Sequence, residues 1–483
     1  MTYRGGVATN GRVGAIGLRD LIVDDGTWES WDHPPDEPVD ADAGYADDLE
    51  RARERSGCDE SVITGVGRVG GRTVVLIVSE FAFLGGSIGA AAGNRVVQAL
   101  RRATSAGLPV LAMPASGGTR MQEGTPAFLQ MVAITGAVTA HKAAGLAYLV
   151  YLRHPTTGGV FASWGSLGHV TWAQPGALVG FLGPRVYEGL YGEPFPAGVQ
   201  TAENLSHIQL VDAVLDAKTL RNVLGLVLGL LEKSGAAHHP SVRRETAVPD
   251  IDAWTAVQAT RETRRAGVIE LLGAGESVIL NSGPMRLALS RFGNRVAVVI
   301  GQDRAAQADG QLIAARHLRV ARRGLAMAAD LGLPVITVID TPGAELSASA
   351  EEDGLAAEIA RCTAELIDVA VPTVSVLLGQ GGGGAALALF PADRRVARHD
   401  AWLSPLPPEG ASLIVHRDTD HAADLARRQG ILAAELARSG VIDELIGPTG
   451  DISARIAETL MRQLDSIAGP DFAARTRVPG SGR

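Results

Sequence analysis

The fold is decided by the stretch HPTTGGV at residues 154–160, which follows the apolar run LAYLVYL at residues 146–152. An unbroken apolar run of this length is typical of a buried strand, so Gly158 and Gly159 stand where that strand leaves the sheet. Glycine has no side chain to cover its own backbone, and adjacent glycines at a strand exit let bare N–H groups face a ligand. These two residues therefore predict a hydrogen-bonding site for an oxyanion.

The second half of the chain contains a parallel arrangement. Apolar residues 371–378 are followed by the glycine-rich run GQGGGGA at residues 379–385. Two further pairs of segments match: GGRTVVLIV at 70–78 with GNRVAVVI at 293–300, and GLPVL at 107–111 with GLPVI at 332–336. The shift is 223 residues for the first pair (72 to 295) and 225 for the second (109 to 334). The chain is predicted to be a tandem repeat, and its two glycine exits predict one reaction with two oxyanions.

Helical patterns alternate with these strands, at residues 91–106, 121–144, 313–331 and 351–369. Strand, helix and strand at this spacing predict right-handed βαβ crossovers and an α/β fold. In chain order we predict a lead-in at residues 1–57, a first domain at 58–235, a linker at 236–255, a second domain at 256–468 and a flexible tail at 469–483.

Composition excludes several classes of function. The formal net charge of −9 over 483 residues argues against a broad nucleic-acid or anionic-membrane surface, which would need clustered positive charge. The two cysteines, Cys58 and Cys362, form neither a disulfide framework nor a four-thiolate zinc site, and no pair of histidines has a metal-site spacing. Without a signal peptide or an apolar run of about 18 residues, a cytoplasmic protein with no bound metal is expected.

Two glycine-rich segments carry competing interpretations. GGSIG at residues 85–89 fits the nucleophile pattern G-x-S-x-G and would make Ser87 a hydrolase nucleophile, or else Gly85 and Gly86 form a wall that a ligand approaches closely. SGGTR at residues 116–120 follows a strand and precedes a helix, so free N–H groups and one guanidinium could meet an anionic ligand there. The alternative for this second segment is a helix cap with Arg120 in a structural ion pair.

These segments resemble a known family. FLGGSIG at 83–89, ASGGTRM at 115–121, PTTGGV at 155–160 and GFLGPRV at 180–186 are similar to the β carboxyltransferase subunit of bacterial acetyl-CoA carboxylase. IDTPGA at 339–344, AEEDG at 350–354, residues 379–387 and residues 404–412 resemble its α subunit. The resemblance covers residues 17–447, and the fusion of both parts in one chain is like the single-chain carboxyltransferase subunits of actinobacterial acyl-CoA carboxylases.

The resemblance implies a fold and a site. The fold would be two tandem crotonase-like (ClpP/crotonase) β-β-α spiral domains, with coenzyme A held mainly by the first and biotin mainly by the second. Gly158 and Gly159 would cradle the thioester carbonyl, and Gly384 and Ala385 would form the biotin-side donor pair. The acyl-CoA would be bound by Gly85, Gly86, Ser116, Gly117, Gly118 and Arg120, and biotin by Gly343, Ala344, Gly382 and Gly383.

Three positions depart from the α-subunit pattern G-E-G-G-S-G-G-A-L. They are Gln380 in place of the acid, Gly383 in place of the serine and Ala385 in place of the second glycine. An alanine still donates its N–H group if its φ is negative, but its methyl group could crowd biotin. The biotin side is therefore where the sequence leaves alternatives open.

The family's reaction moves a carboxyl group from carboxybiotin on a carrier protein to an acyl-CoA of the acetyl-CoA or propionyl-CoA type, giving a malonyl-CoA-type product as in fatty acid biosynthesis. The chain contains no biotin carboxylase segment and no Met-Lys-Met biotinylation site, so partner subunits with biotin carboxylase and carrier functions are implied, as is a homo-oligomer with sites between subunits. Two alternatives keep the fold: a malonyl-thioester decarboxylase, and a non-catalytic scaffold subunit of a larger carboxylase.

Overall fold

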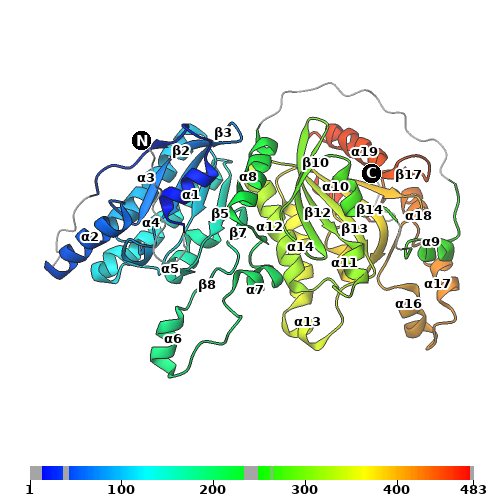
Figure 1. Cartoon of the computed structure of the whole chain (residues 1–483). Helices are drawn as coiled ribbons and strands as arrows, with labels where there is room; N and C mark the ends of the chain where they lie inside the picture. The colour runs from blue at the N-terminus through cyan, green and yellow to red at the C-terminus, as the bar shows by residue number, and fades with distance from the viewer. Residues whose placement is uncertain (1–12, 36–42, 233–248, 263–264, 479–483) are drawn as a thin grey trace. The chain divides into compact units, whose positions relative to one another are not determined.

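The computed structural model describes residues 13–35, 43–232, 249–262 and 265–478 (Figure 1). The chain divides into two compact units, Met1–Gly229 and Leu230–Arg483, called unit 1 and unit 2 below. The described part of the predicted lead-in belongs to unit 1. The predicted linker at residues 236–255 lies largely outside the described residues.

Unit 1 contains a seven-stranded mixed sheet in the order β1-β2-β3-β4-β5-β7-β9. Its strands are β1 (Glu29–Ser30), β2 (Val62–Val69), β3 (Arg72–Ser79), β4 (Val110–Met113), β5 (Tyr148–Leu152), β7 (Val170–Ala173) and β9 (Ala213–Val214). From β3 to β9 neighbouring strands are parallel, as crossover connections require. A two-stranded parallel sheet, β6 (Thr156–Thr157) with β8 (Val179–Gly180), continues from the end of β5.

The helices of unit 1 are α1 (Ala15–Ile22), α2 (Ala43–Ser56), α3 (Ala90–Ala106), α4 (Gly124–Ala143), α5 (Gly158–Phe161), α6 (Pro184–Tyr191), α7 (Ala202–His207) and α8 (Ala217–Leu231), the last running across the unit boundary. In Figure 1, α6 lies on a segment that projects away from the sheet. Helix α3 packs against β2, β3 and α4, and its side chains Val96 and Leu100 join Val75 and Ile77 of β3 in one fully or nearly fully buried core.

Unit 2 repeats this plan with an eight-stranded sheet. Its strands are β10 (Glu276–Ile279), β11 (Met285–Phe292), β12 (Arg295–Gln302), β13 (Val335–Thr341), β14 (Thr373–Gly382), β15 (Arg394–Arg398) and β17 (Glu444–Ile446), with β16 (Trp402–Ser404) paired to the far end of β14. Its helices are α9 (Ala253–Ala259), α10 (Val268–Gly273), α11 (Arg304–Ala308), α12 (Ala315–Leu331), α13 (Ala348–Glu352), α14 (Leu355–Asp368), α15 (Gly383–Leu387), α16 (Pro408–Val415), α17 (Ala422–Arg428), α18 (Ala433–Arg438), α19 (Ile452–Ser466) and α20 (Phe472–Arg475).

The predicted repeat is confirmed. Helices α3 and α12 begin and end at equivalent positions, 225 residues apart. Each is followed by a left-handed glycine, Gly107 and Gly332, with a φ of +65°. Strand β14 corresponds to β5 and β6 joined into one long strand, and β16 corresponds to β8. The two matching segments at residues 70–78 and 293–300 begin at equivalent hairpin turns, which connect β2 with β3 and β11 with β12.

Two predictions about unit 2 are wrong. The helix predicted at residues 351–369 is divided into α13 and α14, because Gly354 adopts a left-handed φ of +76°. The predicted flexible tail is ordered up to residue 478. Arg475 is 2% exposed, forms an ion pair with Asp393 at 2.8 Å (Nε to Oδ1), and donates hydrogen bonds to the carbonyls of Ile367, Val369 and Val371.

Candidate active site

The predicted exit at Gly158 and Gly159 is a sharp turn from β6 into α5. Gly158 has a φ of +61°, a conformation that L side chains rarely adopt. Its N–H donates to the carbonyl of Phe181 at 2.9 Å and is not open to a ligand. The N–H of Gly159 has no acceptor among the described residues, and Gly159 is half-buried, whereas Val160 is fully buried. Gly159 is therefore the open backbone donor of this turn.

The loop at Ser116, Gly117 and Gly118 lies against this donor. The N–H of Thr157 donates to the carbonyl of Ser116 at 2.9 Å, and the N–H of Gly118 donates to Ser116 Oγ at 3.0 Å. A methyl group added to Gly118 would lie 3.5 Å from the nitrogen of Gly159, so glycine at 118 leaves the donor uncovered. Two residues that were not among the predicted site residues, Thr119 and Met131, also face Gly159.

Gly85 and Gly86 hold this loop from the other side. The carbonyl of Gly85 accepts from the N–H of Gly117 at 2.9 Å. Gly86 has a φ of +63°, and a methyl group there would clash with the carbonyl oxygen of Ala115. Five glycines and one serine predicted on the acyl-CoA side are thus brought together: Gly85, Gly86, Ser116, Gly117, Gly118 and Gly159.

Arg120 does not face a ligand, and the predicted contact with acyl-CoA gives way to the structural alternative. Its guanidinium is 1% exposed and forms a two-pronged ion pair with Glu60, with Nη1 to Oε2 at 3.0 Å. It also donates to the carbonyl of Ser87 at 2.9 Å. Burial alone would lower the pKa of this guanidinium, but the hydrogen bonds and charge of Glu60 raise it. Arg120 therefore stays charged and ties the two glycine loops to the core.

Ser87 lacks the setting of a nucleophile. It follows a 3-10 turn at Leu84–Gly86 and not a strand end. The hydrogen bond that its hydroxyl makes is accepted from Arg120 Nε at 3.4 Å, and no general base contacts it among the described residues. An arginine cannot take a proton from a hydroxyl at neutral pH, so the hydrolase interpretation is not supported.

The second exit repeats the first at a shift of 225 residues. Gly383, with a φ of +62°, begins α15 as Gly158 begins α5. Gly384 is half-buried, and its N–H has no acceptor among the described residues; Ala385 is fully buried. The predicted pair Gly384 and Ala385 therefore corresponds to Gly159 and Val160, one residue beyond the pair predicted in unit 1. The open donor of unit 2 is Gly384.

This correspondence assigns Ala385 to the core and not to the donor pair. It does not have the positive φ of the turn residue, and no part of it is exposed. Its methyl group occupies the place of the buried Val160 side chain of unit 1, so it belongs to the core. The structure gives no sign that Ala385 covers the donor at Gly384.

The remaining residues predicted on the biotin side make the same backbone contacts as their counterparts in unit 1. The N–H of Gly343 donates to Thr341 Oγ1 at 3.1 Å, as that of Gly118 donates to Ser116, and Ala344 pairs with Ile313 as Thr119 pairs with Ile88. A methyl group at Gly382 would clash with the carbonyl oxygen of Pro342. Thus Gly343, Ala344, Gly382 and Gly383 form the same wall in unit 2 that the serine–glycine loop forms in unit 1.

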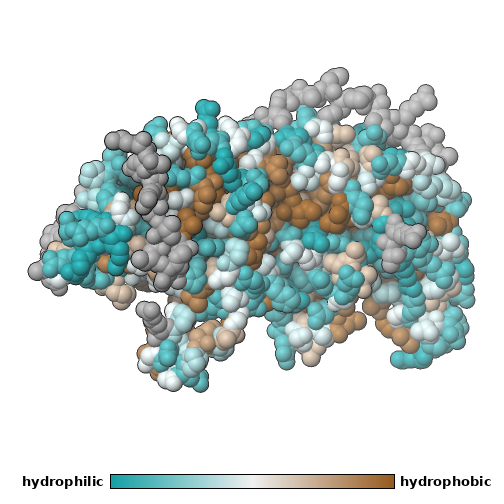
Figure 2. Space-filling view, viewed as in Figure 1, coloured by the Kyte–Doolittle hydropathy of each residue, from teal (hydrophilic) through white to brown (hydrophobic). Residues whose placement is uncertain are grey.

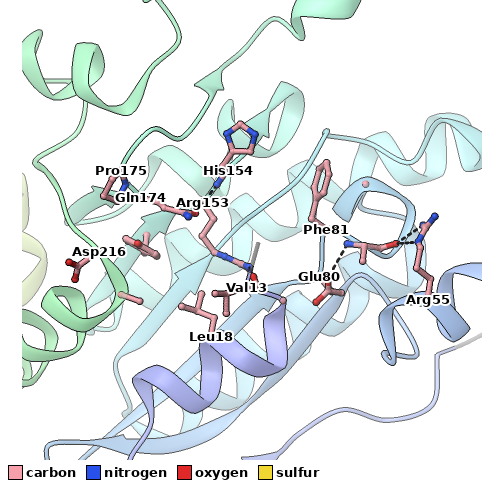
Figure 3. A pocket seen from close by; sticks show the side chains of 15 residues that line it. Val13, Leu18, Arg55, Glu80, Phe81, Arg153, His154, Gln174, Pro175 and Asp216 are labelled. Carbon is pink, nitrogen blue, oxygen red and sulfur yellow. Dashed lines mark hydrogen bonds between the residues drawn. The ribbon is translucent and has the colours of Figure 1, made fainter. Parts of the chain in front are cut away.

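Unit 1 contains a cavity of about 590 Å³, whose lining does not include Gly158 or Gly159 (Figure 3). It lies at the carboxyl ends of β3, β5 and β7, where Glu80, Arg153 and Gln174 follow the strands, and it reaches Gly85. Arg153 is 6% exposed and donates to the carbonyls of Ser79 and Val13 at 2.6 and 2.7 Å. Burial lowers the pKa of Arg153 to about 10. The cavity was not predicted; Arg153 and His154, which directly follow a buried strand, are the sequence signal that could have indicated it.

Solved structures share the whole architecture. Transcarboxylase 12S, determined as a hexamer with methylmalonyl-coenzyme A bound, matches 98% of this chain and 92% of its own with a TM-score of 0.76 at 17% sequence identity. A single-chain, multi-domain long-chain acyl-CoA carboxylase matches 94% of this chain and 46% of its own with a TM-score of 0.70 at 19% identity. The fold is therefore the predicted pair of crotonase-like α/β domains, the class of fold on which these carboxyltransferases are built.

Sequence comparisons narrow the class to a family. The profile described as carboxyl transferase domain matches residues 31–261, and that described as acetyl co-enzyme A carboxylase carboxyltransferase-like matches residues 248–469. A probable biotin-dependent acyl-coenzyme A carboxylase beta3 subunit of Mycobacterium tuberculosis is 52% identical over 96% of this chain and 95% of its own. The beta/alpha carboxyl transferase subunits of acetyl-coenzyme A carboxylase from Salinispora tropica are 35% identical over 83% of this chain and 76% of theirs. This chain belongs to the carboxyltransferase subunits of biotin-dependent acyl-CoA carboxylases, and it is an enzyme that transfers a carboxyl group.

Proposed function

We propose that this chain transfers the carboxyl group of carboxybiotin, carried by a separate protein, to an acyl-CoA of the acetyl-CoA or propionyl-CoA type. The observation that carries the proposal is the pair of equivalent open donors, Gly159 in unit 1 and Gly384 in unit 2. The reaction develops negative charge on two oxygens, and each donor meets one of them.

On the acyl-CoA side, the N–H of Gly159 binds the thioester oxygen. It stabilises the enolate that forms when the α-proton leaves, and the enolate carbon then attacks the carboxyl group. Gly118 keeps the space beside Gly159 open, because any side chain at 118 would lie against the donor nitrogen. A backbone donor fixed by a buried loop needs no reorganisation during the reaction, which is why it lowers the barrier.

The residues of unit 2 fit a biotin ring. The N–H of Gly384 is open, and no atom lies within 4 Å of the position that a side chain at Gly343 would take. When bound, carboxybiotin supplies the carboxyl group and, as it is released, a base for the α-proton. Gly384 would hold the ring oxygen, and Gly343 and Ala344 would pack beside it. Among the described residues, no group of three or more His, Cys, Asp or Glu side chains could hold a metal ion.

Partner subunits are part of the proposal. The segment that carries α6 exposes large apolar side chains (Figure 2), of which Phe181, Leu190 and Tyr191 are 66 to 71% exposed. Apolar groups gathered on one arm are typical of a protein interface. This supports a homo-oligomer, and the description of the 52% identical relative as a beta3 subunit supports a separate carrier and biotin carboxylase. None of the described helices is long and apolar enough to span a membrane.

The test is the reverse reaction. Purified chain incubated with malonyl-CoA or methylmalonyl-CoA and free biotin should release carbon dioxide and form the decarboxylated acyl-CoA, at a rate that rises with biotin. A panel of acyl-CoA substrates with a carboxylated carrier protein then gives the acyl chain. Absence of turnover with every carboxylated acyl-CoA would contradict the proposal.

Two alternatives remain for the assay. The malonyl-thioester decarboxylase was motivated by the altered biotin side, at Gln380, Gly383 and Ala385, and the scaffold subunit by Ala385 alone. The burial of Ala385 in the core counts against a donor disabled by that residue. A decarboxylase would turn over malonyl-CoA at the same rate with and without biotin, and a scaffold would not turn it over at all. The biotin dependence measured in the same assay separates all three.

A further inference from the structure

A buried network of polar side chains lies beneath the open donor of unit 2. It consists of Gln302 at the end of β12, Gln307 in α11 and Thr341 at the end of β13, which are 0%, 4% and 0% exposed. Polar groups this deeply buried are costly unless they are hydrogen-bonded. The amide groups of both glutamines and the Thr341 hydroxyl all have partners, so the network is complete.

Gln302 joins β13 to the donor helix α15. Its Nε2 donates to the carbonyl of Ala385 at 2.7 Å, and its Oε1 accepts from the N–H of Asp340 at 3.2 Å. That N–H points at Gln302 where the pairing of β13 with β14 is interrupted by a register shift between Ile339 and Thr341. One side chain therefore fixes the carbonyl of the residue that follows the open donor, Gly384.

Gln307 extends the network to the opposite wall. Its Nε2 donates to the carbonyl of Asp340 at 3.0 Å, and its Oε1 accepts from Thr341 Oγ1 at 2.6 Å. Thr341 Oγ1 in turn accepts from the N–H of Gly343 at 3.1 Å. A continuous run of hydrogen bonds thus connects Gly343, on one side of the proposed biotin position, with Ala385 on the other.

The described residues of unit 1 form no such network. Strands β3 and β12 match from Arg72 and Arg295 onward, so Ser79 takes the place of Gln302. The hydroxyl of Ser79 is buried and has no hydrogen-bond partner among the described residues. Since unit 1 forms the same turn without the glutamine, the fold itself does not require Gln302.

We propose that Gln302 is a positioning residue for the biotin-side donor. By holding the Ala385 carbonyl it sets the direction of the first turn of α15, and with it the direction of the Gly384 N–H. This inference rests on the proposed function. A displacement of about 1 Å in a donor that acts through its direction can cost about 100-fold in rate. Loss of the amide should therefore lower kcat while acyl-CoA binding, which takes place in unit 1, is unchanged.

The experiment compares Gln302→Met and Gln302→Glu with the wild-type chain in the biotin-dependent decarboxylation of malonyl-CoA. Both variants should lose about 10- to 100-fold in kcat at saturating biotin, with KM for malonyl-CoA unchanged within twofold. Gln302→Glu should recover as the pH falls, because a protonated carboxyl group can again donate to Ala385, and Gln302→Met should not. Ser79→Ala, the matched change in unit 1, should leave both constants unchanged.

The outcomes distinguish failure of the proposed function from failure of the role proposed for Gln302. If the wild-type chain shows no biotin-dependent turnover, the proposed function fails and the role of Gln302 fails with it. If the wild-type chain is active and folded Gln302→Met retains its kcat within twofold, positioning by Gln302 is wrong. Equal losses in kcat and in malonyl-CoA affinity, or identical pH profiles for the two variants, would reduce Gln302 to a structural residue. Should Gln302→Met fail to fold, the pH recovery of Gln302→Glu decides alone.

Discussion

In unit 1 the loops around the turn at Gly158 are tied down by a charged pair, Arg120 with Glu60, whereas in unit 2 the equivalent turn at Gly383 rests on the neutral amide of Gln302. The backbone is nonetheless the same, with φ of +61° and +62° at the two turn glycines. Equal geometry with different supports indicates that the turn is what both units preserve.

Blocking each open donor in turn is the strongest test of the equivalence of the two turns. Gly159→Val should lower carboxyl transfer by about 1,000-fold or more, because a branched side chain beside Thr119 and Met131 fills the space next to the open N–H. Gly384→Val should do the same in unit 2. The two variants should differ in ligand binding: only Gly159→Val should weaken acyl-CoA binding, measured by calorimetry.

Gly136→Ala is the control for these glycine replacements. Gly136 lies in α4 with no atom within 4 Å of the added methyl group, so the activity should be that of the wild type. Equal acyl-CoA affinity in Gly159→Val and Gly384→Val would contradict the assignment of one substrate to each unit.

The repeat, the hairpins and most helices could be predicted because they depend on local pattern. The strand at residues 146–152 was visible as an apolar run, and the helix ending at Gly107 as a glycine after an apolar periodicity. Within each predicted pair, the sequence could not show which of the two N–H groups is open. In a run of four glycines each letter is alike, and only the φ of +62° at Gly383 shows which one makes the turn.

Long-range partners explain what the sequence did not show. Arg120 was assigned to a ligand because its neighbours are glycines, but its partner Glu60 lies 60 residues earlier in the chain. Arg475 was assigned to a flexible tail, but its partner Asp393 lies 82 residues away. Spacing along the chain cannot distinguish a free guanidinium from one that is buried and paired.

The buried ion pair of Arg120 with Glu60 in unit 1 should stabilise the fold, whereas Glu345, at the position of unit 2 that is equivalent to Arg120, should contribute little. Arg120→Met leaves Glu60 buried without a counter-ion and should lower the free energy of unfolding by about 3–5 kcal/mol. At the equivalent position in unit 2, Glu345 is half-buried and its carboxylate accepts from Ser347 Oγ. Glu345→Gln should change stability by less than about 0.5 kcal/mol. Urea denaturation of both variants measures the contrast, and equal effects would contradict it.

The two units also differ in a titratable group at the end of β13, where unit 2 has Asp340. Asp340 is fully buried, with its Oδ2 3.3 Å from Arg304 Nε, and burial raises its pKa to about 6 from an ordinary value of 3.8. The residue at the equivalent position of unit 1 is Ala115. Because the folded chain holds this proton to higher pH than the unfolded chain does, ionisation of Asp340 weakens the fold as pH rises from about 4 to 6.

The free energy of unfolding should fall by about 3 kcal/mol for a shift of about 2 pKa units, and the full loss should be reached above pH 6. Asp340→Asn keeps the oxygen that accepts from the N–H of Gln380 but removes the ionisation. The stability of this variant relative to the wild type should therefore increase by about 3 kcal/mol between pH 4 and pH 7, measured by urea denaturation across that range. A difference that does not vary with pH would show that Asp340 titrates normally.

The smallest expected effect concerns Ala385, which distinguishes the two glycine runs in sequence but not in structure. If its methyl group covered the donor, Ala385→Gly would raise the rate of biotin-dependent turnover. Since the methyl group is buried where Val160 lies in unit 1, the change should instead cost about 1 kcal/mol of stability, through the poor helix propensity of glycine and lost packing. The kcat should stay within about threefold of the wild type. Val160→Ala should likewise lower stability without raising kcat, because both side chains serve the core behind an open donor. A tenfold gain in kcat for Ala385→Gly alone would show that the two exits are not equivalent, and that the biotin side of this chain is restrained by its one departure from glycine.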